Sequence, residues 1–226
     1  MQESPPRHIR SFVMRGGHIT EAQRAHRERL LPKWGIAYRP ETLDLQEVFQ
    51  RAGPVILEIG FGMGETTAAI ASAHPEWNIL AVDVYRPGVG ALLRRIEQEE
   101  LSNIRILEWD AVEVLDHMIM RESLDAVHIY FPDPWPKKRH HKRRLIQPAF
   151  IRLLVERIRQ GGILHMATDW PDYAEQMLAV CSAQPQLRNQ AGAGFSSRPP
   201  WRPQTKFEAR GLRLGHSVAD LIFQKK

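Results

Sequence analysis

Strand-like apolar segments alternate with helical segments along most of this chain, and this alternation limits the possible fold more than any other feature. Six segments are typical of strands, at residues 55–59, 79–84, 104–108, 124–131, 163–168 and 217–223. Helices are predicted between them, over residues 65–73, 88–99, 111–119, 148–159 and 171–182. Strands that alternate with helices form a parallel sheet with helices on both faces. The sequence therefore predicts an α/β fold whose ligand site lies at the carboxyl ends of the strands.

Local signals outside this pattern predict further boundaries. Thr20 followed by Gln23 is a capping box that opens a helix, and Pro32 is expected to break the segment that follows. The Gly161-Gly162 pair is expected to end the helix before the fifth strand. Residues 184–204, rich in Pro, Gly, Ser and Gln, are predicted to be a loop.

The charge of the chain is concentrated in one place. The net charge is +5, and residues 137–144 contain six Lys/Arg without an acid. Outside this run, 25 basic residues face 26 acidic ones, so the excess is a local patch suited to a polyanion. A solvated charge run is the plainer alternative. The chain has one cysteine, Cys181, which excludes an intrachain disulfide framework or a Cys-rich zinc site.

Other compositional signals concern location and metal. The N-terminus has no apolar leader, and no run of about 18 apolar residues occurs, so we expect no membrane span and a cytoplasmic protein. No histidine pair has the H-E-x-x-H spacing of a zinc site, so we expect no metal.

A glycine-rich loop follows the first strand, with the form E-x-G-x-G-x-G at Glu58, Gly60, Gly62 and Gly64. A nicotinamide-binding loop would have G-x-G-x-x-G, and Glu65 at the helix start would repel a pyrophosphate. No G-x-x-x-x-G-K-[ST] sequence occurs, which excludes a P-loop. The loop therefore favours a ligand without phosphate.

Acidic residues lie at or near the ends of five successive predicted strands: Glu58, Asp83, Asp110, Asp133 and Asp169. Any one of them alone could be a turn or cap residue. As a set, the first three suit different groups of one ligand. Glu58 suits an ammonium, Asp83 the hydroxyls of a ribose, and Asp110 an exocyclic amine. These groups together describe S-adenosyl-L-methionine (SAM), which has no phosphate.

The segment YFPDPWPKKRHHKRR, residues 130–144, combines a rigid turn with the basic patch. Pro132 and Pro134 restrict the backbone on both sides of Asp133. A fixed carboxylate beside dense positive charge indicates an active site that handles a polyanion.

With these motifs the chain resembles the bacterial tRNA (guanine-N7-)-methyltransferases, the TrmB family. The matching segments cover nearly the whole chain, at residues 9–20, 56–67, 130–145, 167–178 and 202–223. The resemblance implies a three-layer, Rossmann-like class I methyltransferase fold with a mostly parallel seven-stranded sheet. It also implies one domain over residues 1–226, with a catalytic core at 53–226 and an N-terminal extension at 1–42 that is a candidate for RNA contact.

The resemblance further implies roles for individual residues. SAM contacts are expected at Glu58, Gly60, Gly62, Gly64, Asp83, Asp110 and Asp133. Substrate contacts are expected at Lys137, Asp169, Thr205, Lys206, Phe207 and Glu208. RNA contacts are expected at Arg139, His140, His141, Lys142, Arg143 and Arg144. The partner would be tRNA, methylated in its variable loop, and no obligate protein partner is implied. Two departures stand out: Asp83 replaces a common Glu, and His141 a common Asn.

The chemistry assigns Asp133 a particular task. Guanine N7 carries an in-plane lone pair and no proton, so attack on a sulfonium methyl needs no general base. Asp133 is therefore expected to position the base and stabilise developing positive charge. An exocyclic-amine methyltransferase is the alternative enzyme, although its turn needs an aromatic residue where Pro136 stands. A non-catalytic RNA-binding subunit with a SAM fold is a second alternative.

Overall fold

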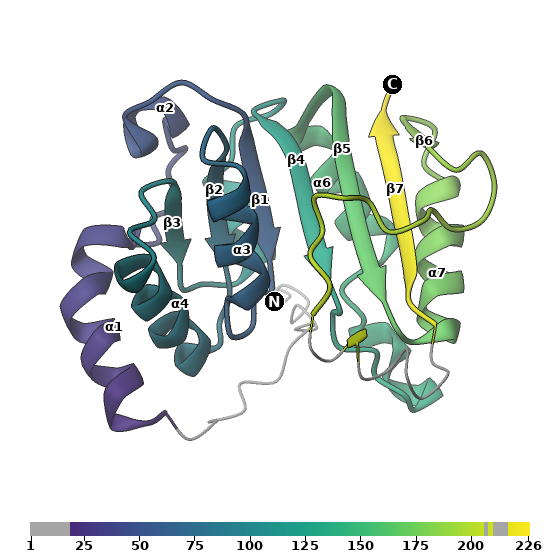
Figure 1. The fold of residues 1–226 in the computed structure, drawn as a ribbon. Helices are drawn as coiled ribbons and strands as arrows, with labels where there is room; N and C mark the ends of the chain where they lie inside the picture. Colours follow the sequence, from purple (N-terminus) through teal and green to yellow (C-terminus); the bar gives the residue numbers. More distant parts are fainter. Residues whose placement is uncertain (1–18, 206–207, 210–216) are drawn as a thin grey trace, which may run out of the picture.

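A seven-stranded sheet in the order β3-β2-β1-β4-β5-β7-β6 forms the centre of the molecule (Figure 1). The structure, a computed structural model, describes residues 19–205, 208–209 and 217–226. The strands are β1 (Val55–Ile59), β2 (Asn78–Val82), β3 (Ile104–Leu107), β4 (Leu124–Tyr130), β5 (Ile158–Thr168), β6 (Leu187–Asn189) and β7 (Ala219–Lys225). The pairs among β1–β5 are parallel, and β7 runs antiparallel to both β5 and β6. The predicted α/β class with a mostly parallel sheet is confirmed.

Helices cover both faces of the sheet. They are α1 (Glu21–Trp34), α2 (Leu45–Phe49), α3 (Glu65–Ala73), α4 (Arg86–Gln98), α5 (Ala111–His117), the 3₁₀ helix η1 (Lys138–Arg143), α6 (Pro148–Arg157) and α7 (Pro171–Ser182). One buried cluster packs α1, α3 and α4 against the sheet, and the other packs α2, α5, α6 and α7 against the opposite face. Figure 1 shows α1, α3 and α4 together in front of the sheet. No helix of the described part of the chain is long and apolar enough to cross a membrane.

Side chains of β1 show why the strands are mostly apolar. Leu57 and Ile59 point into the cluster with α5 and α6, whereas Ile56 points into the cluster with α3 and α4. Successive strand residues face opposite sides, so a sheet covered on both faces favours apolar residues at most positions, and Glu58 is the polar exception in β1. Each of these side chains contributes about 1.5–3 kcal/mol by burial.

The strand order places a topological switch point beside β1. The chain continues from β1 to β2 on one side, whereas β4 pairs with the other side of β1. Ligands of such sheets bind outside the carboxyl ends of the strands at this point. The glycine loop after β1 and the Asp133 turn after β4 both lie at this edge.

Three local predictions were wrong. Pro32 does not break its segment, because it lies in the last turn of α1, which closes with Gly35 N donating to Leu31 O (2.7 Å). Gly161 and Gly162 do not end α6, which stops at Arg157. They lie instead in an irregularity of β5, between the pairs Leu124–Ile158 and Ala126–Ile163. The predicted loop at residues 184–204 contains the short strand β6, whose three residues are too few to give a periodic signal.

Candidate active site

The glycine loop between β1 and α3 faces open space at two positions. Gly60 and Gly62 have φ of 78° and 56°, a region that glycine adopts without strain. A Cβ atom on either residue would meet nothing within 4 Å. Gly60 N donates to Val82 O and Gly62 N donates to Asp83 Oδ2, each at 2.8 Å. The loop is thus tied to β2 and leaves room for a ligand to approach its backbone.

Two other glycines allow close packing of α4. Gly64 directly precedes α3 and has φ of 71°, and a Cβ there would lie 2.7 Å from Leu92 Cβ. A cofactor contact is predicted at Gly64, and the structure shows that the side of its Cα that would carry a Cβ faces α4. A Cβ on Gly88, in the first turn of α4, would lie 1.8 Å from Gly62 O. Gly88 was not predicted as a site residue, although a glycine inside a helical pattern is a known signal of close packing.

Glu58 and Asp83 are carboxylates in a poorly hydrated part of the site. Burial is the main cause that raises the pKa of Glu58 to about 7, and the negative charge of the nearby Asp83 contributes to this value. Burial also raises the pKa of Asp83, with a contribution from Asp133, although hydrogen bonds from Gly62 N and Tyr85 N oppose the shift. A buried carboxylate of this kind favours a cationic partner.

Asp110 lies at the start of α5, where its Oδ1 accepts from Val112 N at 2.8 Å and caps the helix. The neighbouring Trp109 is exposed, and its ring stacks on Tyr38 with centroids 4.5 Å apart. If Asp110 contacts adenine as predicted, the same carboxylate would both cap α5 and accept a hydrogen bond from the adenine amine.

Asp133 is exposed in the turn that follows β4. Phe131 and Trp135, which flank this turn, have φ of 50° and 46°, values that bulky side chains rarely adopt. Strain of this kind costs about 1–3 kcal/mol per residue and persists only where the surroundings enforce it. The effect of Asp133 on the pKa of Asp83 shows that the turn and the end of β2 share one electrostatic environment.

The basic run forms η1 and is mostly exposed. Lys137, Lys138, Arg139, Lys142 and Arg143 are exposed, and His140 and His141 are half-buried. Partial burial lowers the pKa of His140, and the surrounding cations lower it further. These side chains therefore form a positive surface beside the Asp133 turn.

Arg144 differs from the rest of the run, because its side chain is 1% exposed. It donates to Pro134 O, Gln176 Oε1 and Asp172 Oδ2. The prediction of an exposed RNA contact does not fit this position.

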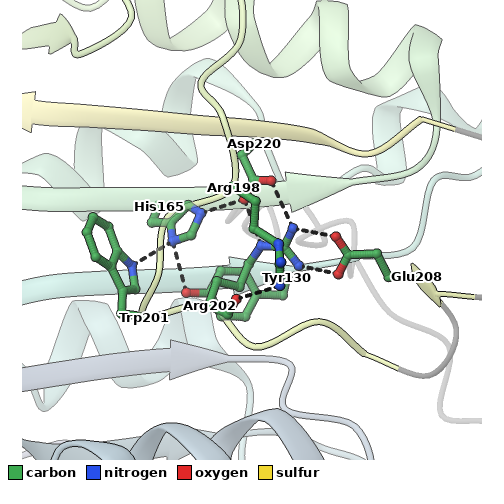
Figure 2. A network of polar contacts seen from close by, with 7 residues as sticks. All are labelled: Tyr130, His165, Arg198, Trp201, Arg202, Glu208 and Asp220. Atoms are coloured by element: carbon green, nitrogen blue, oxygen red, sulfur yellow. Dashed lines mark hydrogen bonds and ion pairs between the residues drawn. The ribbon is translucent and has the colours of Figure 1, made fainter. Parts of the chain in front are cut away.

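Glu208, predicted to bind substrate, is buried in a charge network (Figure 2). The Arg202 guanidinium donates to both carboxylate oxygens of Glu208, at 2.6 and 2.8 Å, and to both of Asp220, at 2.7 and 2.8 Å. All three side chains are at most 3% exposed. Glu208 could contact a guanine directly only if its carboxylate released the Arg202 guanidinium.

His165 extends the same network toward β4. His165 Nε2 lies 2.8 Å from Asp220 Oδ1, while Tyr130 Oη and Trp201 Nε1 lie 3.0 and 3.2 Å from its Nδ1 (Figure 2). The indole N–H can only donate, so Nδ1 accepts and Nε2 donates to Asp220. Burial lowers the pKa of His165, which agrees with this neutral imidazole. Sequence reasoning missed Arg202, His165 and Asp220; a polar residue inside an apolar strand was the available signal for His165 and Asp220, whereas Arg202 lies outside the strands.

The remaining predicted substrate residues lie in several places. Asp169 is exposed directly after β5, next to the strand that precedes Asp133, and Lys137 is exposed at the start of η1. Thr205 Oγ1 accepts from Glu208 N at 3.0 Å. Lys206 and Phe207 lie outside the described residues. The described residues contain no cluster of His, Cys, Asp and Glu that could hold a metal ion.

Comparison with known sequences identifies relatives over the full length. The family model described as "Putative methyltransferase" matches residues 52–221. A tRNA (guanine-N(7)-)-methyltransferase from Nitrosospira multiformis is 57% identical, covering 100% of this chain and 98% of that protein. A protein of the same name from Bordetella pertussis is 60% identical, covering 96% of this chain and 85% of its own.

Solved structures show the same fold at low identity. The 16S rRNA methyltransferase KamB has a TM-score of 0.59 at 16% identity, covering 82% of this chain and 95% of its own. An rRNA methylase from Streptococcus thermophilus has a TM-score of 0.53 at 14% identity, covering 80% of this chain and 91% of its own. With the observed strand order, these matches establish a Rossmann-like class I methyltransferase fold.

Proposed function

The chain belongs to the tRNA (guanine-N(7)-)-methyltransferases, and from this premise we propose that it methylates N7 of a guanine in the variable loop of tRNA, with SAM as methyl donor. The observation that carries the proposal is the meeting of the glycine loop and the Asp133 turn at the switch point of the sheet, beside an exposed basic helix. We expect the protein to act in the cytoplasm, where its substrate is found.

The glycine loop, Glu58 in β1 and the acids that follow β2 and β3 fit SAM. The open space at Gly60 and Gly62 admits a ligand close to the backbone. Glu58 would pair with the ammonium, Asp83 would accept from the ribose hydroxyls, and Asp110 would accept from the adenine amine. When bound, SAM supplies a methyl group on a positively charged sulfur.

Asp133 would orient the guanine and stabilise the charge that develops on its ring. A carboxylate can accept hydrogen bonds from the N–H groups on the Watson–Crick edge, which leaves N7 directed away from Asp133. Since N7 has no proton, Asp133 removes none. Its contribution is orientation and charge, both of which depend on a fixed position. Asp169, after the neighbouring strand, would assist in holding the base.

The exposed cations of η1 would hold the tRNA backbone. Lys138, Arg139, Lys142 and Arg143 lie on one short helix beside the turn, directly after Lys137, and all five side chains suit phosphate groups. Residues 1–42 remain a candidate for further RNA contact; within them, α1 packs on α4, with Arg29 paired to Glu97.

The decisive experiment incubates the protein with methyl-labelled SAM and unmodified tRNA, followed by reduction and aniline cleavage of the RNA. N7-methylguanine gives a strand break, which we expect at one site in the variable loop. Label without a break would refute N7 and favour an exocyclic amine. Absence of label would favour a non-catalytic RNA-binding subunit.

A further inference from the structure

Arg144 is among the largest fully buried side chains of the described residues, although it ends an exposed basic run. Its Nη2 donates to Asp172 Oδ2 at 2.6 Å, and its Nη1 donates to Gln176 Oε1 at 2.7 Å. The guanidinium also lies 4.8 Å from the centre of the Tyr173 ring. All three partners belong to α7, so Arg144 is fixed to this helix and is not available to a phosphate.

Arg144 Nη2 also lies 3.1 Å from His141 Nε2, whereas its Nε points at the Asp133 turn. Its Nε donates to Pro134 O at 2.8 Å, and Pro134 directly follows Asp133. A guanidinium has a rigid, planar arrangement of donors, so its contacts with α7 set the direction in which Nε points. The hydrogen bond therefore links the position of the turn to α7.

The turn needs such an external contact. Phe131 and Trp135 have left-handed φ at its two ends, which bulky residues rarely adopt. The ring closures of Pro132 and Pro134 fix φ at those residues but leave the peptide between Pro134 and Trp135 free to rotate. The carbonyl that Arg144 holds belongs to that peptide.

We propose that Arg144 is a positioning residue for methyl transfer: it holds the Pro134 carbonyl and so keeps Asp133 in the place that the reaction needs. This rests on the proposed function. Asp172, the exposed partner of Arg144, has a pKa below its ordinary value because Arg144 donates to it, so the pair is charged at neutral pH.

The experiment compares Arg144→Met with Arg139→Met, which removes an exposed cation of the same helix. Both variants and the wild type are measured for single-turnover methyl transfer, for tRNA affinity over a range of salt, and for SAM affinity. Arg144→Met should lower the rate at saturating tRNA by roughly 100-fold, because small displacements of catalytic groups have effects of this size. Its tRNA affinity and salt slope should match the wild type.

Arg139→Met should show the opposite pattern. It should bind tRNA more weakly, and the dependence of its binding on salt should have a slope smaller by about one. At saturating tRNA its rate of methyl transfer should return to that of the wild type. If Arg144→Met gives this same pattern, Arg144 is an RNA contact and the proposal is overturned.

Arg144→Lys keeps a positive charge beside Asp172, so this variant should remain folded if Arg144→Met does not. SAM affinity and the thermal midpoint of unfolding show whether each variant is folded. One ammonium cannot reproduce the fork that reaches Pro134, Gln176 and Asp172 together, so the rate should remain at least tenfold low. A full wild-type rate in Arg144→Lys would overturn the proposal. A wild-type protein that transfers no methyl group would overturn the proposed function itself.

Discussion

The two halves of the sheet build their parts of the site from different contacts. In the cofactor half, strands β1–β3 with α3 and α4, the loop geometry depends on backbone hydrogen bonds and on glycines that allow close approach. In the substrate half, strands β4–β7 with α6 and α7, buried charges hold the segments together. The two largest are Arg144 and Arg202, each with several hydrogen bonds.

This difference gives the two halves different sensitivities. A buried charge network is sensitive to loss of one charge, because the remaining partners are left unpaired in a medium of low dielectric. A glycine-packed loop is sensitive to added volume, because neighbouring backbone cannot move aside cheaply. Substitutions that change charge should therefore act most in the substrate half, and those that add a methyl group should act most in the cofactor half.

The largest effect is expected for Arg202→Met, which leaves Glu208 and Asp220 buried without their cation. We expect the free energy of unfolding to fall by about 3–5 kcal/mol, measured by urea denaturation. The matched control is Arg152→Met, at an exposed arginine of α6 in the same half, which should change stability by less than about 0.5 kcal/mol. Equal losses in both variants would show that the network does not stabilise the substrate half.

A smaller effect is expected for Gly88→Ala in the cofactor half. The new Cβ would lie 1.8 Å from Gly62 O and would displace the glycine loop. Overpacking of this kind costs about 1–3 kcal/mol, so SAM affinity measured by calorimetry should fall by roughly tenfold or more. Gly90→Ala is the control in the same helix, because its Cβ would lie 2.3 Å from Gln23 O of α1. It should destabilise α1 and leave SAM affinity near that of the wild type.

The smallest effect concerns the protonation of Glu58. Its pKa of about 7 lies above the ordinary value of 4.5. Between pH 4.5 and pH 7, therefore, Glu58 is protonated in the folded protein to a greater extent than in the unfolded chain. Stability without ligand should therefore fall as pH rises from about 4.5 to about 7. If the ammonium of SAM pairs with the ionised form, SAM affinity should be about tenfold weaker at pH 6 than above pH 7. Glu58→Gln should remove this pH dependence, and a wild-type affinity that stays constant over the same range would contradict the pairing.

The cofactor half could be predicted from sequence almost completely. The bounds of β1, α3 and the glycine loop were predicted correctly, because apolar runs and glycines act over a few neighbouring residues. The packing of Gly64 against Leu92 was missed, since it depends on how α4 lies against the loop.

The substrate half was predicted less well because its contacts join distant residues. Arg144 contacts residues 28 and 32 positions away in α7, and Arg202 contacts Asp220 18 positions away. Nothing in the local sequence separates a buried arginine from the exposed arginines of a basic run. Burial there depends on the packing of strands and helices, which periodicity alone does not specify.

In the proposed function, the cofactor half binds SAM while Asp133, from the substrate half, acts on the guanine. The most direct measurement compares Asp133→Ala with the wild type, in single-turnover transfer from labelled SAM to tRNA and in calorimetric SAM binding. We predict that transfer falls by roughly 100-fold or more while SAM still binds, because the glycine loop, Glu58 in β1 and the acids that follow β2 and β3 are unchanged. Turnover close to that of the wild type would contradict the role of Asp133.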